Sequence, residues 1–327
     1  MAFTNLMAFT AGLLLLYYGA GWLVRGSSVL ARSLGLTPMV IGLTVVAFGT
    51  SAPELVVSLV SAFKGKSMIA LGNVVGSNIC NITLVLGATA MLQPVTTQRV
   101  VINRDIPLML IISLGLLLLS VNSLISRVEG IVLMAGIVAY TWFNYKVALE
   151  VRRTLPDRSD TDATLAVPES GLLRRRWFQL LLVAAGMAAV VLGADLLVDA
   201  AVRIMSVLGV SDRVVGLTVV AFGTSVPELA TSVVAAMKKE MEISLGNLVG
   251  SNVFNLLSVV GATAAVRPIT ISGGFFGSGL AVDYLVMMAV SALPWLLMRQ
   301  NLILSRANGS LLLGCYVVYV TSLILKA

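Results

Sequence analysis

Apolar runs long enough to cross a lipid bilayer recur along almost the whole of this 327-residue chain. A helix needs about 20 consecutive apolar residues to cross a hydrocarbon core of about 30 Å. Only 11% of the residues are charged, whereas soluble domains contain roughly 25%. The sequence therefore predicts an all-α, polytopic membrane protein whose surroundings are the lipid bilayer. We place ten spans at 5–24, 36–63, 68–92, 105–122, 128–146, 177–199, 210–237, 243–266, 279–298 and 307–325.

The distribution of basic residues predicts the orientation of these spans. With the amino terminus outside, the inside loops hold 15 of the 22 Lys and Arg residues. Cytoplasmic loops of membrane proteins carry such an excess. We therefore expect both termini outside and the long loop 147–176 in the cytoplasm, as a linker between two halves. The net charge of +7 is then a topology signal and requires no nucleic-acid partner. The first apolar run lacks a basic leader and a cleavage site, so we expect a retained span.

The two halves of the chain, 1–146 and 177–327, repeat each other. The string "GLTVVAFGTS" occurs identically at 42–51 and at 216–225, an offset of 174 residues. Each half contains five spans, and an odd number of spans inverts the second half relative to the first. Inverted repeats are typical of secondary transporters that alternate access to a site near the bilayer midplane. The predicted fold is thus ten transmembrane helices arranged as two inverted five-helix repeats.

A proline followed by a glutamate lies within the second and the seventh spans, as Pro53–Glu54 and Pro227–Glu228. Proline removes a backbone donor, so each helix should be broken near its middle. Such breaks are tolerated where the freed carbonyls line a cavity. A charge at membrane depth costs at least about 2.5–3.5 kcal/mol, which indicates a functional role. In each span the helical face of the glutamate also carries two hydroxyl side chains, Thr50 and Ser51 in the second span and Thr224 and Ser225 in the seventh.

The third and eighth spans carry the related strings "GNVVGSNICN" (72–81) and "GNLVGSNVFN" (246–255). Their polar residues recur every four positions, so each helix has one polar stripe on an apolar surface. The stripes consist of Asn73, Ser77 and Asn81, and of Asn247, Ser251 and Asn255. Asn73 and Asn247 also fit a second interpretation, interhelical packing through polar bonds. A phosphate-binding loop is excluded because the spacing differs and no lysine follows.

These four spans together supply a set of hard oxygen ligands. Carboxylate, hydroxyl and amide oxygens are available, with backbone carbonyls near Ala47, Thr50, Ala221 and Thr224. Calcium takes six to eight oxygens in flexible geometry, whereas transition metals favour His or Cys. The chain has no histidine, and its two cysteines, Cys80 and Cys315, lie in separate apolar segments where no disulfide is expected. Two carboxylates would balance the charge of one Ca²⁺.

The strings "GTSAPE", "GNVVGSN", "GTSVPE" and "GNLVGSN", within 42–81 and 216–255, resemble the alpha repeats of sodium/calcium exchangers in the calcium/cation antiporter superfamily. The resemblance covers all ten spans and implies exchange of Na⁺ for Ca²⁺ at one midplane cluster. It also implies a prokaryotic member of this superfamily, located in the inner membrane. The residues to which the resemblance assigns a role in ion binding are Ala47, Thr50, Ser51, Glu54, Ser77, Asn81, Ala221, Thr224, Ser225, Glu228, Ser251 and Asn255.

Two features depart from the pattern of this family. The linker 147–176 is too short for the calcium-sensing domains that animal members carry between their repeats. Asn255 stands where potassium-dependent and some prokaryotic relatives carry aspartate, which leaves two acids in the cluster and predicts transport independent of K⁺. We expect no permanently bound cofactor and no obligate protein partner.

Three other functions are compatible in part with an apolar chain of this kind: a proton/calcium antiporter, a passive cation channel and an intramembrane enzyme. A proton/calcium antiporter and a passive cation channel would use similar oxygen ligands, although an inverted repeat in one chain favours alternating access. An intramembrane enzyme is disfavoured because no activated nucleophile or histidine is present.

Four acids lie outside the proposed cluster. Asp105 and Asp283 are interpreted as helix N-caps. Asp195 and Asp199 fit either an outer vestibule or a solvated interface.

Overall fold

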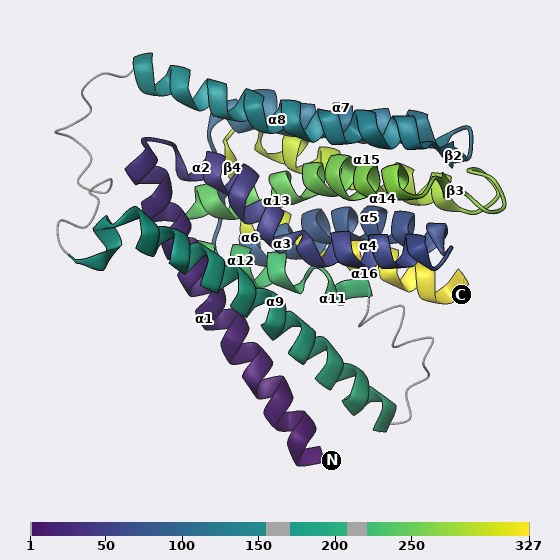
Figure 1. Ribbon diagram of the computed structural model, residues 1–327, viewed down its shortest axis with the longest axis horizontal. Helices are drawn as coiled ribbons and strands as arrows, with labels where there is room; N and C mark the ends of the chain where they lie inside the picture. Colours follow the sequence, from purple (N-terminus) through teal and green to yellow (C-terminus); the bar gives the residue numbers. More distant parts are fainter. Residues whose placement is uncertain (1, 155–170, 208–220, 327) are drawn as a thin grey trace.

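The computed structural model describes residues 2–154, 171–207 and 221–326, which form an almost entirely helical bundle. Two long helices, α1 (Ala2–Leu34) and α9 (Arg176–Val207), cross the bundle obliquely (Figure 1). By contrast, α7 (Ile106–Ser120), α8 (Arg127–Thr154) and α15 (Leu280–Met298) lie along one common direction. The all-α class predicted from the sequence is confirmed.

Most of the remaining spans are built from short helices that follow one another with little interruption, and η1, η2, η3 and η7 are π-helical turns. The first half contains α2 (Pro38–Ile41), η1 (Gly42–Val46), α3 (Ala47–Thr50), α4 (Ala52–Phe63), α5 (Ser67–Cys80), η2 (Asn81–Val85), α6 (Leu86–Leu92) and η3 (Val101–Asp105). The second half contains α11 (Ala221–Gly223), α12 (Val226–Met237), α13 (Met241–Phe254), η7 (Asn255–Val259), α14 (Val260–Val266) and α16 (Arg306–Lys326). A short 3₁₀ turn, η5 (Leu172–Arg174), precedes α9.

The helices agree closely with the ten predicted spans. Eight described helices are long and apolar enough to cross a membrane, and the bent pair α2–α3 and α4 makes a ninth. Of the span predicted at 210–237, the described residues comprise α11 and α12. Three helices, α1, α8 and α9, extend beyond the predicted limits because a helix continues after its apolar run ends. At its end, α1 is closed by Gly35 in the left-handed region, with φ of 68°, and by the N–H of Leu36 donating to the carbonyl of Ala31 over 2.8 Å.

The two oblique helices pack against each other through glycines that correspond in the two repeats. A Cβ atom at Gly12 of α1 would lie 2.9 Å from the carbonyl oxygen of Gly193 in α9. At Gly186 of α9, a Cβ atom would lie 2.5 Å from the backbone nitrogen of Leu23. The backbones therefore approach too closely for a side chain, as small residues allow in membrane helix pairs.

The third and eighth spans form the centre of the bundle. Within Met68–Leu92, 72% of the most apolar window is buried inside the protein, and within Met241–Val266 the share is 78%. For α16 the share is 11%, so most of that helix faces outward. The two spans with polar asparagine stripes are therefore the two most enclosed of these helices.

Two short antiparallel ribbons join the repeats at the ends of the spans. β1 (Val95–Thr96) pairs with β4 (Ile303–Leu304), and β2 (Leu124–Ile125) pairs with β3 (Ile269–Thr270). Each ribbon takes one strand from each half of the chain. The pairing places the loops that contain β1 and β4 on one side of the bundle, as the alternation of ten spans requires.

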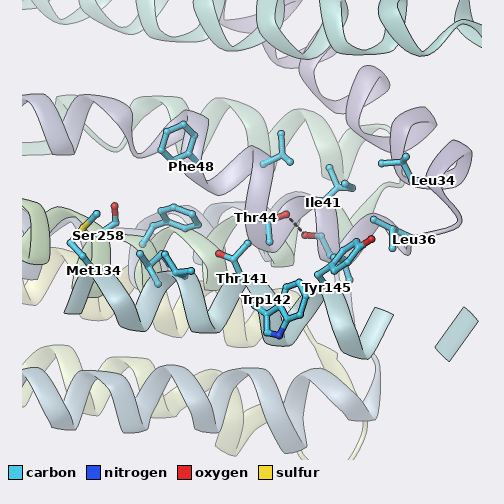
Figure 2. Close-up of a pocket in the computed structure, with 15 residues that line it drawn as sticks. Leu34, Leu36, Ile41, Thr44, Phe48, Met134, Thr141, Trp142, Tyr145 and Ser258 are labelled. Carbon is cyan, nitrogen blue, oxygen red and sulfur yellow. Dashed lines mark hydrogen bonds between the residues drawn. The ribbon is translucent and has the colours of Figure 1, made fainter. Parts of the chain in front are cut away.

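An apolar groove of about 660 Å³ lies between the segment α2–α3 and α8 (Figure 2). Its lining includes Leu36, Phe48, Trp142 and Tyr145, with few polar atoms among them. The ring centroids of Phe48 and Phe254, both in this lining, are 5.7 Å apart. Such a lining offers no set of oxygen ligands for a hard cation. The polar residues singled out from the sequence lie elsewhere, inside the bundle.

Candidate cation-binding site

The second span is broken where proline was expected to break it. α3 ends at Thr50 and α4 begins at Ala52, with Ser51 between them at φ −81° and ψ 4°. The two segments are bent by 43°. Pro53 stands in the first turn of α4 and supplies no backbone N–H. Ser225, at φ −89° and ψ 3°, repeats this junction before α12.

The two glutamates begin the helices that follow these breaks and are completely buried. Glu54 lies in the first turn of α4 and Glu228 in the first turn of α12, each with 0% exposure. The amino end of a helix favours negative charge. Neither carboxylate oxygen of Glu54 has a hydrogen-bond partner, and neither has Oε2 of Glu228. The Oε1 atom of Glu228 accepts a 3.4 Å hydrogen bond from the hydroxyl of Ser51, in the other repeat.

The hydroxyl residues form reciprocal contacts between the repeats. Thr50 donates to Oδ1 of Asn247 over 3.0 Å, and its hydroxyl lies 3.3 Å from that of Ser251. In the mirrored arrangement, Thr224 donates to Oδ1 of Asn73 over 3.4 Å and lies 3.2 Å from the hydroxyl of Ser77. Ser77 also neighbours the carboxylate of Glu54, while Thr50, Ser51 and Ser251 neighbour that of Glu228. Each broken helix thus contacts the polar stripe of the opposite repeat.

The asparagines at the end of each stripe leave their oxygens free. Asn81 and Asn255 are completely buried, and each begins a π-helical turn, a feature frequent at functional sites. The Nδ2 atom of Asn81 donates to Oδ1 of Asn252, and that of Asn255 donates to Oδ1 of Asn78, both over 3.1 Å. The Oδ1 atoms of Asn81 and Asn255 have no partner. Both residues therefore present an unpaired amide oxygen inside the bundle.

The remaining predicted ligands differ between the repeats. The carbonyl of Ala47 already accepts from the N–H of Ser51 over 3.0 Å and from the Thr50 hydroxyl over 3.4 Å. The N–H of Ser225 instead donates to the carbonyl of Phe222, so it does not occupy the carbonyl of Ala221. The hydroxyl oxygen of Ser225 is buried without a partner. The roles of Ala47 and Ala221 as ligands remain predictions.

The composition of this cluster suits a hard cation. Its acids are Glu54 and Glu228, and no group of three or more His, Cys, Asp or Glu side chains able to hold a metal occurs among the described residues. All its other polar groups are neutral hydroxyls, amides and carbonyls. The cluster thus offers two negative charges and several neutral oxygens.

Comparison with known proteins places this geometry in a family. A family model described as "Sodium/calcium exchanger protein" matches residues 4–146 and 178–325, which is nearly the whole of both repeats. The chain belongs to the sodium/calcium exchanger protein family. It is therefore a member of a family of transporters.

Relatives of this chain match it over almost their full length. Inner membrane protein YrbG of Escherichia coli (strain K12) is 35% identical over 314 residues, covering 95% of this chain and 94% of YrbG. Sodium/calcium exchanger MaX1 of Methanosarcina acetivorans is 29% identical and covers 99% of both chains. A solved structure of the sodium-calcium exchanger NCX_Mj matches with a TM-score of 0.82 and 31% identity, covering 99% of this chain and 100% of that one. The ten-helix inverted repeat agrees with this match.

The sequence analysis missed four polar residues that contact the candidate site. Asn78 and Asn252 hold the amides of the two terminal asparagines, as described above. Ser58 accepts from Nδ2 of Asn73 over 3.0 Å, and Ser232 accepts from Nδ2 of Asn247 over 3.3 Å. The second interpretation of Asn73 and Asn247, interhelical polar bonds, is thus confirmed. A usable signal was present, because all four supporting residues recur at the offset of 174.

The interpretation of Asp105 and Asp283 as N-caps was wrong. Asp105 lies within a helix that already began at Val101 and makes no capping bond; its carboxylate pairs with the guanidinium of Arg104 over 2.7 Å. The cap of α15 is Gly279, and Asp283 lies one turn later, where it accepts from the hydroxyl of Tyr319 over 3.4 Å.

Asp195 and Asp199 lie on the exposed surface of α9, which fits both interpretations given above, an outer vestibule and a solvated interface. The carboxylate of Asp199 is 73% exposed and lies 3.9 Å from the guanidinium of Arg203.

Proposed function

We propose that this protein is a secondary active antiporter that exchanges Na⁺ for Ca²⁺ by alternating access at the cluster around Glu54 and Glu228. The observation that carries the proposal is the burial of both carboxylates with three of their four oxygens unpaired. Burying an ionised carboxylate without a partner is strongly unfavourable. A bound cation would offset this cost, so the buried pair of carboxylates is suited to binding a cation.

Calcium fits the available ligands. It binds six to eight oxygens in flexible geometry. The carboxylates of Glu54 and Glu228, with the free amide oxygens of Asn81 and Asn255, supply much of this shell. Hydroxyls complete the set that we propose: Thr50, Ser51, Ser77, Thr224, Ser225 and Ser251. The printed names of MaX1 and NCX_Mj, sodium/calcium exchangers, support these substrates.

Alternating access is supported by the mirrored contacts of the repeats. Thr50 contacts Ser251 in the same way as Thr224 contacts Ser77. Because the two half-sites are inverted relative to each other, a movement of one set of helices against the other can expose the bound ion first to one side of the membrane and then to the opposite side. The same ligands can then open to one side of the membrane and afterwards to the other.

We also propose the inner membrane of a prokaryote as the location, with both termini outside and the linker 147–176 in the cytoplasm. The excess of basic residues in alternate loops supports this orientation. The name of YrbG, an inner membrane protein, supports the membrane.

Calcium uptake by sodium-loaded proteoliposomes tests the proposal. We expect uptake that saturates with Ca²⁺, requires the Na⁺ gradient and is unaffected by an imposed pH gradient. Uptake driven by a pH gradient alone would show a proton/calcium antiporter instead. Uptake that needs no counter-ion and does not saturate would show a channel.

A further inference from the structure

Four buried asparagine side chains, two of which are proposed ligands, link the two repeats. They are Asn78 and Asn81, at the junction of α5 and η2, and Asn252 and Asn255, at the junction of α13 and η7. All four are at most 1% exposed. Each primary amide has a donor side and an acceptor side, and only the acceptor side can bind a cation. The direction in which each amide points therefore matters for ion binding.

The orientation of the Asn255 amide is set, through Asn78, by the backbone carbonyl of Asn252. The Nδ2 atom of Asn78 donates to the backbone carbonyl of Asn252 over 3.3 Å. A carbonyl can only accept, so Asn78 must present its NH₂ group there and its oxygen toward Asn255. Asn255 in turn donates its NH₂ group to this oxygen over 3.1 Å. Its own Oδ1 atom is thereby left facing away, unpaired and buried.

The orientation of Asn81 follows from a weaker acceptor. The Nδ2 atom of Asn252 contacts the sulfur of Met109 at 3.7 Å, and thioether sulfur accepts only weakly. The oxygen of Asn252 then receives the NH₂ group of Asn81 over 3.1 Å. The Oδ1 atom of Asn81 is again unpaired. In each repeat one asparagine thus orients an asparagine of the other repeat. The orienting amide of Asn78 donates to a backbone carbonyl, whereas that of Asn252 donates to the weaker acceptor sulfur of Met109.

We propose that Asn78 and Asn252 are positioning residues that hold the amides of Asn255 and Asn81 with oxygen, and not NH₂, toward the transported cation. The proposal rests on the function proposed above. Without its partner, either amide can turn and present N–H donors to the carboxylates, which removes a ligand and repels a cation. Because the sulfur of Met109 is the weaker acceptor, Asn81 is held less firmly than Asn255.

Substitution of Asn78 by alanine, in two backgrounds, separates positioning from structural support. We expect Asn78→Ala to raise the Ca²⁺ KM by about 5- to 100-fold, the equivalent of a buried amide left unpaired. In an Asn255→Asp background, the same change should alter the KM by less than about twofold, because a carboxylate presents oxygen in either orientation. Asn144→Ala is the matched control, since Asn144 is equally buried and hydrogen-bonded but belongs to α8. It should leave the KM unchanged in both backgrounds.

Met109→Leu provides a second variant of nearly unchanged volume that keeps the test decisive if Asn78→Ala does not fold. We expect a smaller rise in the Ca²⁺ KM, abolished when Asn81→Asp is also present. An equal rise in KM with and without the aspartate background would overturn the positioning role. If the wild-type protein takes up no Ca²⁺, the proposed function fails. If the wild type takes up Ca²⁺ but the rise in KM is the same with and without Asn255→Asp or Asn81→Asp, only the positioning role fails.

Discussion

Replacing either buried glutamate by glutamine removes a charge while keeping the size of the side chain. The test variants are Glu54→Gln and Glu228→Gln, each at a position with 0% exposure. Removing the carboxylate partner of a buried cation typically costs about 3–5 kcal/mol, as for any buried pair of opposite charges. With about 1.4 kcal/mol for each factor of ten, that loss weakens Ca²⁺ binding by roughly 10²- to 10³-fold or more. We therefore expect Ca²⁺ exchange to fall to background in both variants at concentrations that saturate the wild type.

Thermal unfolding of the purified protein distinguishes lost binding from lost folding. A ligand at 100 times its Kd stabilises the folded state by about 2.7 kcal/mol. Ca²⁺ should therefore raise the Tm of the wild type but not of either glutamine variant. Without cations, the variants should be at least as stable as the wild type, because a buried carboxylate with unpaired oxygens is replaced by a neutral amide. Asp199→Asn serves as the control, since that carboxylate is 73% exposed and its removal should change the free energy of unfolding by at most about 0.5 kcal/mol.

Two results would refute this reasoning. Wild-type exchange rates in proteoliposomes containing either glutamine variant would show that the carboxylates do not bind the transported cation. A variant that unfolds in detergent before any cation is added would assign the glutamates a structural role. In either case the ligand set around the broken helices would have to be abandoned.

Three further predictions use separate features of the chain. Because Asn255 carries no charge, Ca²⁺ uptake should be the same in choline and potassium media, and a strict K⁺ requirement would contradict the two-acid cluster. Gly186→Ala should destabilise the packing of α1 against α9, since the added Cβ would lie 2.5 Å from the nitrogen of Leu23. Gly115→Ala is the control, because a Cβ there meets nothing within 4 Å and should stabilise its helix by up to about 1 kcal/mol. Equal thermal stabilities of the two variants would contradict the close approach of α1 and α9. Ser159→Cys, in a part of the linker outside the described residues, should resist a membrane-impermeant thiol reagent in intact cells, and ready labelling would reverse the predicted orientation.

The spans and the broken helices could be predicted from the sequence because each depends on local chemistry. Apolar runs and the charges that end them fix where helices cross the membrane. Pro53 and Pro227 fix where two of these helices break, since proline cannot donate to the preceding turn. The offset between the repeats also indicated which hydroxyls would correspond, and Thr50 and Thr224 do make equivalent contacts.

The features that the sequence analysis missed depend on how distant segments meet. Asn78 and Asn252 share their strings with the predicted ligands, but their partners lie in the opposite repeat. Only the packing of α5 against α13 brings these side chains together. Asp105 was misread because the π-helical turn that ends at this residue starts the helix earlier than the apolar run indicates. Side-chain pairing across an interface and π-helical turns both lack a local sequence signal.

Equilibrium binding of radioactive Ca²⁺ to the purified protein, with increasing Na⁺, tests most directly whether one buried cluster binds both ions. The account predicts one Ca²⁺ per chain, displaced by Na⁺ with a Hill coefficient above one, and no binding when Glu54→Gln and Glu228→Gln are combined. Undiminished Ca²⁺ binding in the combined variant, or binding that Na⁺ does not displace, would contradict it.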